Sequence, residues 1–116
     1  MTLLLVGTVG CILANGLEVV AKIVQAPFVL RNSADVGVAR TWIPYLALLE
    51  GAGTAGLVLG LLGVPLLGLA AAIGLVLFFL GAVTFHVRAR VLHNVAFPAA
   101  FLLLAAVAVG HFARSL

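Results

Sequence analysis

Charged residues are scarce in this 116-residue chain. Asp, Glu, Lys and Arg make up 8% of it, while hydrophobic residues make up 66% and the mean hydropathy is +1.39. A soluble domain carries roughly 25% charged residues, so this chain cannot cover a water-facing surface. The shortage of charge predicts an integral membrane protein, whose first partner is the lipid bilayer.

Cysteine and dense basic runs are scarce too. Cys11 is the only cysteine, which excludes an internal disulfide and a cysteine-rich metal or iron–sulfur site within one chain. The six Lys and Arg residues are dispersed, so we expect no nucleic-acid partner. The amino terminus lacks the charged segment of a signal peptide, and we therefore expect the first hydrophobic segment to be retained.

Long hydrophobic segments are what the chain does contain. A membrane-spanning helix needs about 20 mostly apolar residues. We expect four such helices within a single domain of residues 1–116, at residues 2–23, 42–63, 65–86 and 93–112. The predicted fold class is therefore all-α, an integral membrane four-helix bundle.

Prolines and glycines mark the connections between these helices. The second and third segments meet at the letters GVP, which predicts a tight hairpin with Pro65 in a first helical turn. Pro98 either kinks the fourth helix or marks its true start. The longest connection, residues 24–41, is expected to hold a short interfacial helix around the letters PFVL, followed by Trp42 as an interfacial anchor.

Basic residues divide unevenly between the two ends of such a bundle. Four spans place the first and third connections on one side, together with five cations: Lys22, Arg31, Arg40, Arg88 and Arg90. The other side has Arg114 and the amino terminus. The positive-inside rule therefore predicts that both termini lie on the non-cytoplasmic side of the membrane and that the basic loops face the cytoplasm.

The first helix carries a narrow polar stripe. At about 100° per residue, one face collects Thr8, Cys11, Asn15, Glu18 and Lys22. In lipid, such a stripe must face protein or a water-filled cavity. Glu18 and Lys22 are spaced for an ion pair. Two interpretations stay open: a self-neutralising pair leaving the membrane, or one wall of a pocket.

The second helix adds an acid without a local partner. Glu50 follows Trp42 by eight residues, which places it about 12 Å from the interface at 1.5 Å per residue. A carboxylate at the centre of a membrane helix costs about 2.5–3.5 kcal/mol unless it is protonated or paired. Glu50 is therefore either a protonated side chain bonded to the backbone or a functional acid.

Polar residues of the last two helices fall at the same level. On the third helix, His86 and Arg90 share a face with Phe79, Ala82 and Val83, and the fourth helix begins at His93 and Asn94. All four helices thus bring polar residues to the cytoplasmic half, which predicts one shared pocket there. The catalytic candidates are Glu50, Glu18 and His86. The ligand-binding candidates are Asn15, Lys22, Phe79, His93, Asn94 and Arg90.

This combination of residue types suits proton transfer. Two carboxylates and a nearby histidine can shuttle protons. The chain has no pair of histidines at i, i+4 spacing, so we expect no metal site. The spacing of Gly56 and Gly60 lets another backbone approach closely and predicts a homo-oligomer, with a dimer as the simplest form.

Three stretches together resemble a known family. They are GVARTWIPYLALLEGAGTAGLVLGL, LGLAAAIGLVLFFLGAVTFHVRAR and AFPAAFLLLA. Their patterns, R-x-x-I-P-x-L-x-x-L-E ending at Glu50, G-A-V-x-x-H-x-R-A-R through His86 and Arg90, and F-P-A at Pro98, are similar to those of the DoxX-like family of small bacterial four-helix membrane proteins. The resemblance implies a multi-pass protein of a bacterial inner membrane. The broader group includes a subunit linked to thiosulfate:quinone oxidation and proteins tied to redox complexes.

Three functions stay open. The first is binding of a lipophilic small molecule, with a diffusible quinone as the candidate cofactor, in support of a redox complex or of acid–base chemistry such as isomerisation or epoxide opening. The second is a proton-coupled exporter of the small multidrug type, in which "LEVVAKI" would supply the acid. The third is a non-catalytic assembly subunit bound to a membrane partner protein. Whether the chain is an enzyme stays undecided at this point.

Overall fold

Five α-helices and one 3-10 turn make up the computed structural model, which describes residues 2–116. In chain order they are α1 (Thr2–Ile23), α2 (Pro27–Asp35), η1 (Arg40–Trp42), α3 (Ile43–Leu61), α4 (Pro65–Arg88) and α5 (Ala96–Ser115). Four segments are long and apolar enough to cross a membrane: α1, η1 with α3, α4, and α5. The predicted all-α fold class with four membrane helices is confirmed.

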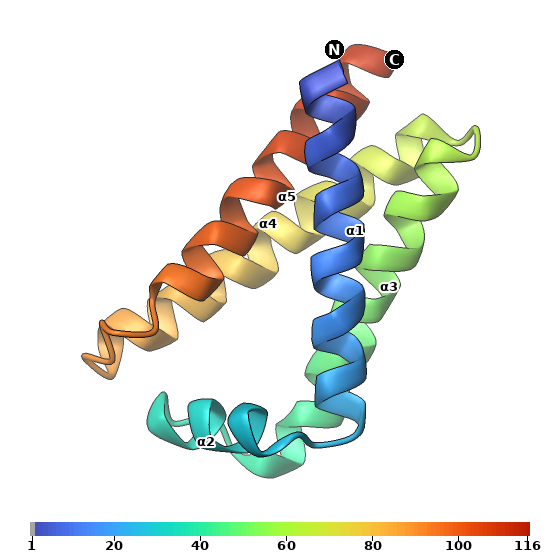
Figure 1. The fold of residues 1–116 in the computed structure, drawn as a ribbon. Coiled ribbons are helices and arrows are strands. Elements are labelled where there is room, and N and C mark those ends of the chain that lie inside the picture. Colours follow the sequence, from blue (N-terminus) through green and yellow to red (C-terminus); the bar gives the residue numbers. More distant parts are fainter. Residues whose placement is uncertain (1) are drawn as a thin grey trace.

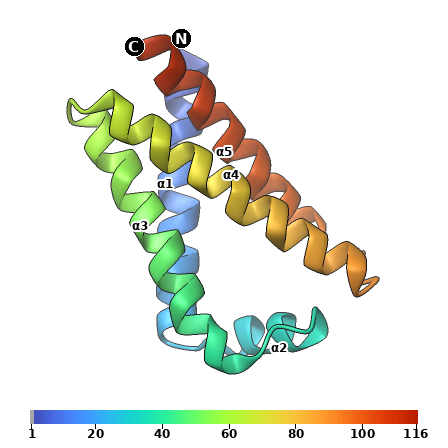
Figure 2. The ribbon, with the colours of Figure 1, turned by 180° about the vertical axis from the view of Figure 1, so that it is seen from behind.

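The four long helices form a closed ring. α1 packs against α3 and α5, and α4 packs against the same two helices, so α1 and α4 lie diagonally across the bundle (Figure 1). The ends of α1 and α5 nearest the two termini lie side by side at one end of the molecule, and the views from front and back agree on this (Figures 1 and 2). Each long helix therefore runs antiparallel to the helices it contacts.

The bundle is tight at the end where the termini lie. A Cβ atom added to Gly60 of α3 would lie 2.5 Å from the Cα of Gly68 in α4 and 2.7 Å from a ring carbon of Phe112 in α5. These glycines let the two backbones touch, and the fully buried Phe112 ring fills the remaining space. The contact holds three helices together at one point.

At its other end the bundle opens. The α4–α5 hairpin diverges from α1 and α3, and α2 lies across the gap at that end (Figure 2). The short interfacial helix expected around PFVL is this α2, which buries Val29 and begins at Pro27. The divergence creates the space in which the site described below lies.

Helix ends follow the prolines and glycines closely. Gly63 takes a φ of 131° between α3 and α4, and Pro65 is the first residue of α4. Pro98 is the third residue of α5, where a missing N–H leaves no helical hydrogen bond unmade. It therefore marks the start of the fourth helix, which spans residues 96–115 and not the expected 93–112.

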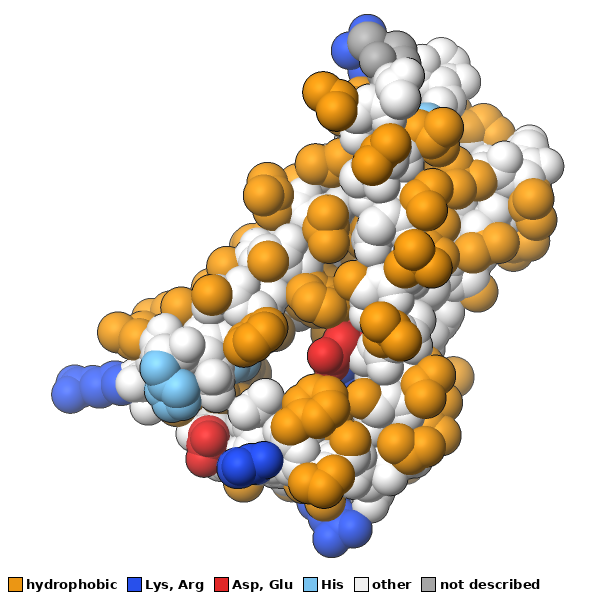
Figure 3. Space-filling model, in the orientation of Figure 1, with side chains coloured by type: hydrophobic (Ala, Val, Ile, Leu, Met, Phe, Trp, Pro, Cys, Tyr) orange, Lys and Arg blue, Asp and Glu red, His pale blue; other side chains and the backbone are white. Residues whose placement is uncertain are grey.

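The outer surface is strongly apolar. Large hydrophobic side chains such as Leu13, Leu17 and Leu77 are more than half exposed, and orange hydrophobic atoms cover the long helices in Figure 3. Blue Lys and Arg side chains lie mainly toward the ends, while a red acidic side chain is visible beside the hollow (Figure 3). A surface of this kind on four spanning-length helices indicates a multi-pass membrane protein.

Candidate functional site

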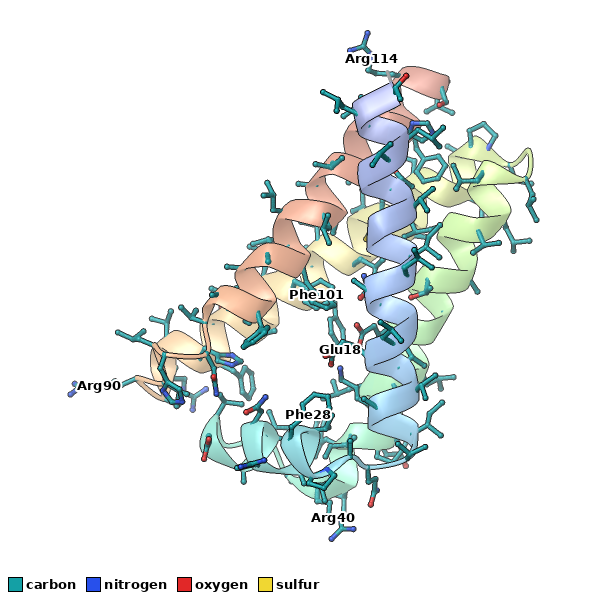
Figure 4. The ribbon with its side chains drawn as sticks, in the orientation of Figure 1. Glu18, Phe28, Arg40, Arg90, Phe101 and Arg114 are labelled. Carbon is teal, nitrogen blue, oxygen red and sulfur yellow. The ribbon has the colours of Figure 1, made fainter. Side chains whose placement is uncertain are left out.

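A cavity of about 650 Å³ lies where the helices diverge. Its walls come from α1, α4 and α5, and α2 with the segment that follows it forms the floor. Figure 3 shows the hollow, and Figure 4 shows Glu18 of α1, Phe28 of α2 and Phe101 of α5 pointing toward it. The volume falls within the range of small-molecule sites, about 300–1,000 Å³.

An ion cluster occupies the α1 side of this cavity. Lys22 Nζ donates hydrogen bonds to Glu18 Oε2 over 3.2 Å and to Glu50 Oε1 over 2.8 Å. The Glu50 side chain is fully buried, that of Lys22 is 15% exposed and that of Glu18 is 32% exposed. The three residues thus run from the cavity surface into the interface between α1 and α3.

Lys22 lowers the free-energy cost of burying the Glu50 carboxylate. A buried carboxylate without a partner is strongly unfavourable, whereas one paired with an ammonium group and hydrogen-bonded is tolerated. Glu50 bonds to Lys22, 28 positions away in the chain, and not to a backbone carbonyl. Sequence reasoning found the Glu18–Lys22 pair and left open whether it leaves the membrane or faces a pocket, but it gave Glu50 no neutralising residue.

Asn15 lies behind this cluster, away from the cavity surface. It is fully buried, and its Nδ2 donates to the carbonyl oxygen of Cys11 over 2.8 Å and lies 3.4 Å from Cys11 Sγ. Among the described residues, Asn15 Oδ1 and Glu50 Oε2 are buried without a hydrogen-bond partner. Neither Asn15 nor Glu50 lines the cavity, so both lie in the packed interior beside it.

The opposite wall carries a second set of polar groups. His86 lies near the end of α4, and its Nδ1 is 2.8 Å from the carbonyl oxygen of Ala82. In the turn after α4, Asn94 Nδ2 donates to Oδ1 of Asn32 in α2 over 3.2 Å. His86, Asn94 and Asn32 all line the cavity. The hydrogen bond between the two asparagines ties the floor of the cavity to the α4–α5 hairpin.

Aromatic residues are prominent in the apolar lining of the cavity. Six of the seven phenylalanines and the single tryptophan line the cavity. The rings of Phe78 and Phe79 meet edge to face with centroids 5.0 Å apart, and Phe79 lies 5.3 Å from Phe101. Sequence reasoning chose only Phe79 for the site. It did not include Phe78, which is adjacent to Phe79 in the sequence, or Phe28 of α2, although both are aromatic residues near the predicted pocket.

The structure brings together most of the predicted site residues. Glu18, Lys22, Phe79, His86 and Asn94 line the cavity, and Asn15 and Glu50 lie buried behind its α1 wall. Their roles in binding or catalysis stay predictions.

Two candidates are not brought to the cavity. The expectation that Arg90 continues the His86 face of the third helix is wrong, because α4 ends at Arg88 and Arg90 takes a left-handed φ of 58°. Figure 4 shows the Arg90 side chain pointing away from the cavity. His93 lies in the turn before α5 and is exposed, because the fourth helix begins three residues later than expected.

The described residues 2–116 contain no group of three or more His, Cys, Asp or Glu side chains that could hold a metal ion. The chemistry that the side chains offer is hydrogen bonding and proton transfer. Glu18 presents a carboxylate at the cavity surface, and Lys22 presents an ammonium group next to it. A ligand that enters the cavity would meet both groups.

Comparison with known proteins identifies the family of the chain. No curated protein and no solved structure matches the chain. The family model for the DoxX-like family matches residues 6–108, a range that includes α2, α3, α4 and every residue that lines the cavity. The match agrees with the resemblance seen in the sequence patterns around Glu50 and His86, and the chain therefore belongs to the DoxX-like family.

Proposed function

We propose that this chain binds a lipophilic small molecule in the cavity and exchanges protons with it through the Glu18–Lys22–Glu50 cluster. The supporting observation is the composition of the cavity wall, in which a carboxylate and an ammonium group stand beside a surface of aromatic rings. Pockets for small molecules combine such apolar walls with a few placed polar groups. The location we propose is a bacterial inner membrane, with the cavity on the cytoplasmic side.

Each member of the cluster has a distinct part in this proposal. Glu18 is the most exposed of the three and is the group that gives a proton to the ligand or takes one from it. Lys22 holds Glu18 in position and donates to a ligand oxygen. Glu50 does not line the cavity and acts through Lys22, so it is a positioning residue.

A quinone is the first ligand class to test. Its carbonyl oxygens accept hydrogen bonds from an ammonium group, its flat ring suits aromatic walls, and its reduction requires protons. The chain has a single cysteine, so a diffusible quinone or a partner protein would carry the electrons in a redox reaction. The same groups would also serve non-redox acid–base chemistry on a hydrophobic substrate.

The single tryptophan gives a direct binding test. Trp42 lines the cavity, so titration of the purified protein in detergent with decylbenzoquinone should quench its fluorescence in a saturable way. Gly81 also lines the cavity, and a Cβ added there meets nothing within 4 Å. Gly81→Leu should therefore fill the site without disturbing the helix and should abolish saturable quenching.

Gly74 provides the matched control. It lies two turns earlier on α4, a Cβ there also meets nothing within 4 Å, and it does not line this cavity. Gly74→Leu should retain quenching by decylbenzoquinone at the wild-type affinity. Equal quenching of the wild type and Gly81→Leu would show that the quinone only dissolves in the micelle, and it would count against the proposal.

A further inference from the structure

The polar lining of the cavity divides into two groups on different walls. Glu18 and Lys22 come from α1, while His86 comes from α4 and the α4–α5 turn supplies Asn94. Because α1 and α4 are diagonal in the bundle, the two groups face each other across the cavity. The cavity lining also includes the rings of Phe79 and Phe101, whose centroids lie 5.3 Å apart.

The hydrogen bond between His86 and the Ala82 carbonyl oxygen determines which ring nitrogen of His86 can accept a hydrogen bond from a ligand. A carbonyl oxygen only accepts hydrogen bonds, so Nδ1, which lies 2.8 Å from it, carries a hydrogen. In the neutral ring, Nε2 is then the acceptor. A ligand therefore binds most tightly when the part of it nearest His86 carries a hydrogen-bond donor.

Two amides complete the second group. Asn94 uses its Nδ2 and Asn32 uses its Oδ1 in their mutual hydrogen bond, which leaves Asn94 Oδ1 as an acceptor and Asn32 Nδ2 as a donor. Glu18 and Lys22 on α1 likewise provide one acceptor and one donor, since Glu18 accepts hydrogen bonds and Lys22 donates them. A hydroxyl group both donates and accepts, so it can be satisfied at either end.

We propose that the site selects a flat molecule with a hydrogen-bonding group at each end, one held by Glu18 and Lys22 and the other by His86 with Asn32 and Asn94. This inference rests on the proposed ligand-binding function and adds the class of ligand and a second binding group. The aromatic middle of the cavity takes the ring system, and the two polar walls set the ligand's length and orientation.

The test compares two probes of one shape. 2-Naphthol carries one hydroxyl group, and 2,6-dihydroxynaphthalene carries one at each end. Calorimetric titration of the full chain in detergent, with empty micelles as the blank, gives an affinity ratio between the two probes. A hydrogen bond contributes about a tenfold gain in affinity, so the wild type should bind the diol about tenfold more tightly than the mono-ol.

Substitution of His86 should remove this preference. His86→Phe keeps a ring but offers no acceptor, so the ratio should fall to about one, whereas His86→Gln keeps an acceptor and should retain part of the preference. His111→Phe, at the far end of α5, is the matched control and should leave the ratio unchanged. The two probes partition into the micelle to different extents, but that difference is the same for every variant, so it cancels when the ratio of a variant is divided by the ratio of the wild type.

The outcomes separate this inference from the proposed function. Equal affinities of the wild type for both probes, or an unchanged ratio in His86→Phe, would overturn the two-ended site while leaving a lipophilic binding site in place. No binding of either probe, together with no saturable quenching by decylbenzoquinone, would overturn both. If His86→Phe does not fold, His86→Leu replaces it and should also lose the preference for the diol, while His86→Gln should retain part of it. An unchanged preference in His86→Leu would overturn the two-ended site.

Discussion

Lys22 of α1 donates to Glu50 of α3 over 2.8 Å, and this contact joins residues 28 positions apart in the chain. The Glu50 side chain is fully buried and that of Lys22 is mostly buried, so this ion pair lies inside the bundle. It sets the relative position of the two helices that form one side of the cavity. The first prediction concerns the loss of this lysine.

Lys22→Met should destabilise the protein severely. The substitution leaves Glu50 buried with no cation, and removal of one partner of a buried pair costs about 3–5 kcal/mol. The measurement is thermal or denaturant unfolding in detergent. Glu18→Gln is the control, because it keeps the Lys22–Glu50 pair and should change stability by much less. A Lys22→Met variant as stable as Glu18→Gln would contradict the role given to the pair.

Gly60→Ala should also destabilise the protein, for a steric reason. The added methyl group would lie 2.5 Å from the backbone of Gly68 and 2.7 Å from the Phe112 ring, so α3 and α4 must move apart. Overpacking of this kind costs about 1–3 kcal/mol. Gly74→Ala meets nothing within 4 Å and should be neutral or stabilising in the same unfolding assay. Equal effects of the two substitutions would show that the close approach is unimportant.

Asn94→Ala should loosen α2. The substitution removes the hydrogen bond to Asn32 that ties the cavity floor to the α4–α5 hairpin. We expect faster hydrogen–deuterium exchange in residues 27–35, detected by mass spectrometry, while exchange in α1 stays unchanged. Leu92→Ala, an exposed position in the same turn, should leave exchange at its wild-type rate. Unaltered exchange in Asn94→Ala would mean that other contacts hold the floor.

The charge distribution predicts orientation in a bacterial membrane. Arg40 and Arg90 lie at the α2 end of the bundle and Arg114 lies at the other end (Figure 4). A fusion of alkaline phosphatase to Leu116 should be active and a fusion of green fluorescent protein there should be dark, because the positive-inside rule places that end outside the cytoplasm. The opposite pattern would place the cavity on the non-cytoplasmic side.

Much of the local structure could be predicted because it depends on periodicity within one helix. The polar stripe of α1 correctly identified its buried residues, Thr8, Cys11 and Asn15, and i, i+4 spacing identified the Glu18–Lys22 pair. Both follow from the 3.6-residue turn and the exclusion of polar groups from lipid. The start of α5 was missed because Pro98 permits two placements, and only packing chooses between them.

The contacts between helices could not be predicted in the same way. The Lys22–Glu50 bond depends on the rotation of α1 against α3, which no spacing within either helix specifies. The aromatic lining depends on the divergence of α4 and α5 from α1, which leaves Phe78 and Phe101 beside a space instead of in a closed core. Arg90 was placed on a helical face that stops at Arg88.

The close contact between Gly60 and Gly68 has a mechanical consequence. It lies at the narrow end of the bundle, so we expect it to be the pivot about which the α4–α5 hairpin would rotate, with the cavity along the free arm. From Gly68 to the end of α4 is about 30 Å at 1.5 Å per residue, so a rotation of about 5° at the pivot moves the far end by about 2.6 Å. Substitutions that widen this contact should therefore change the size of the cavity at the opposite end of the molecule.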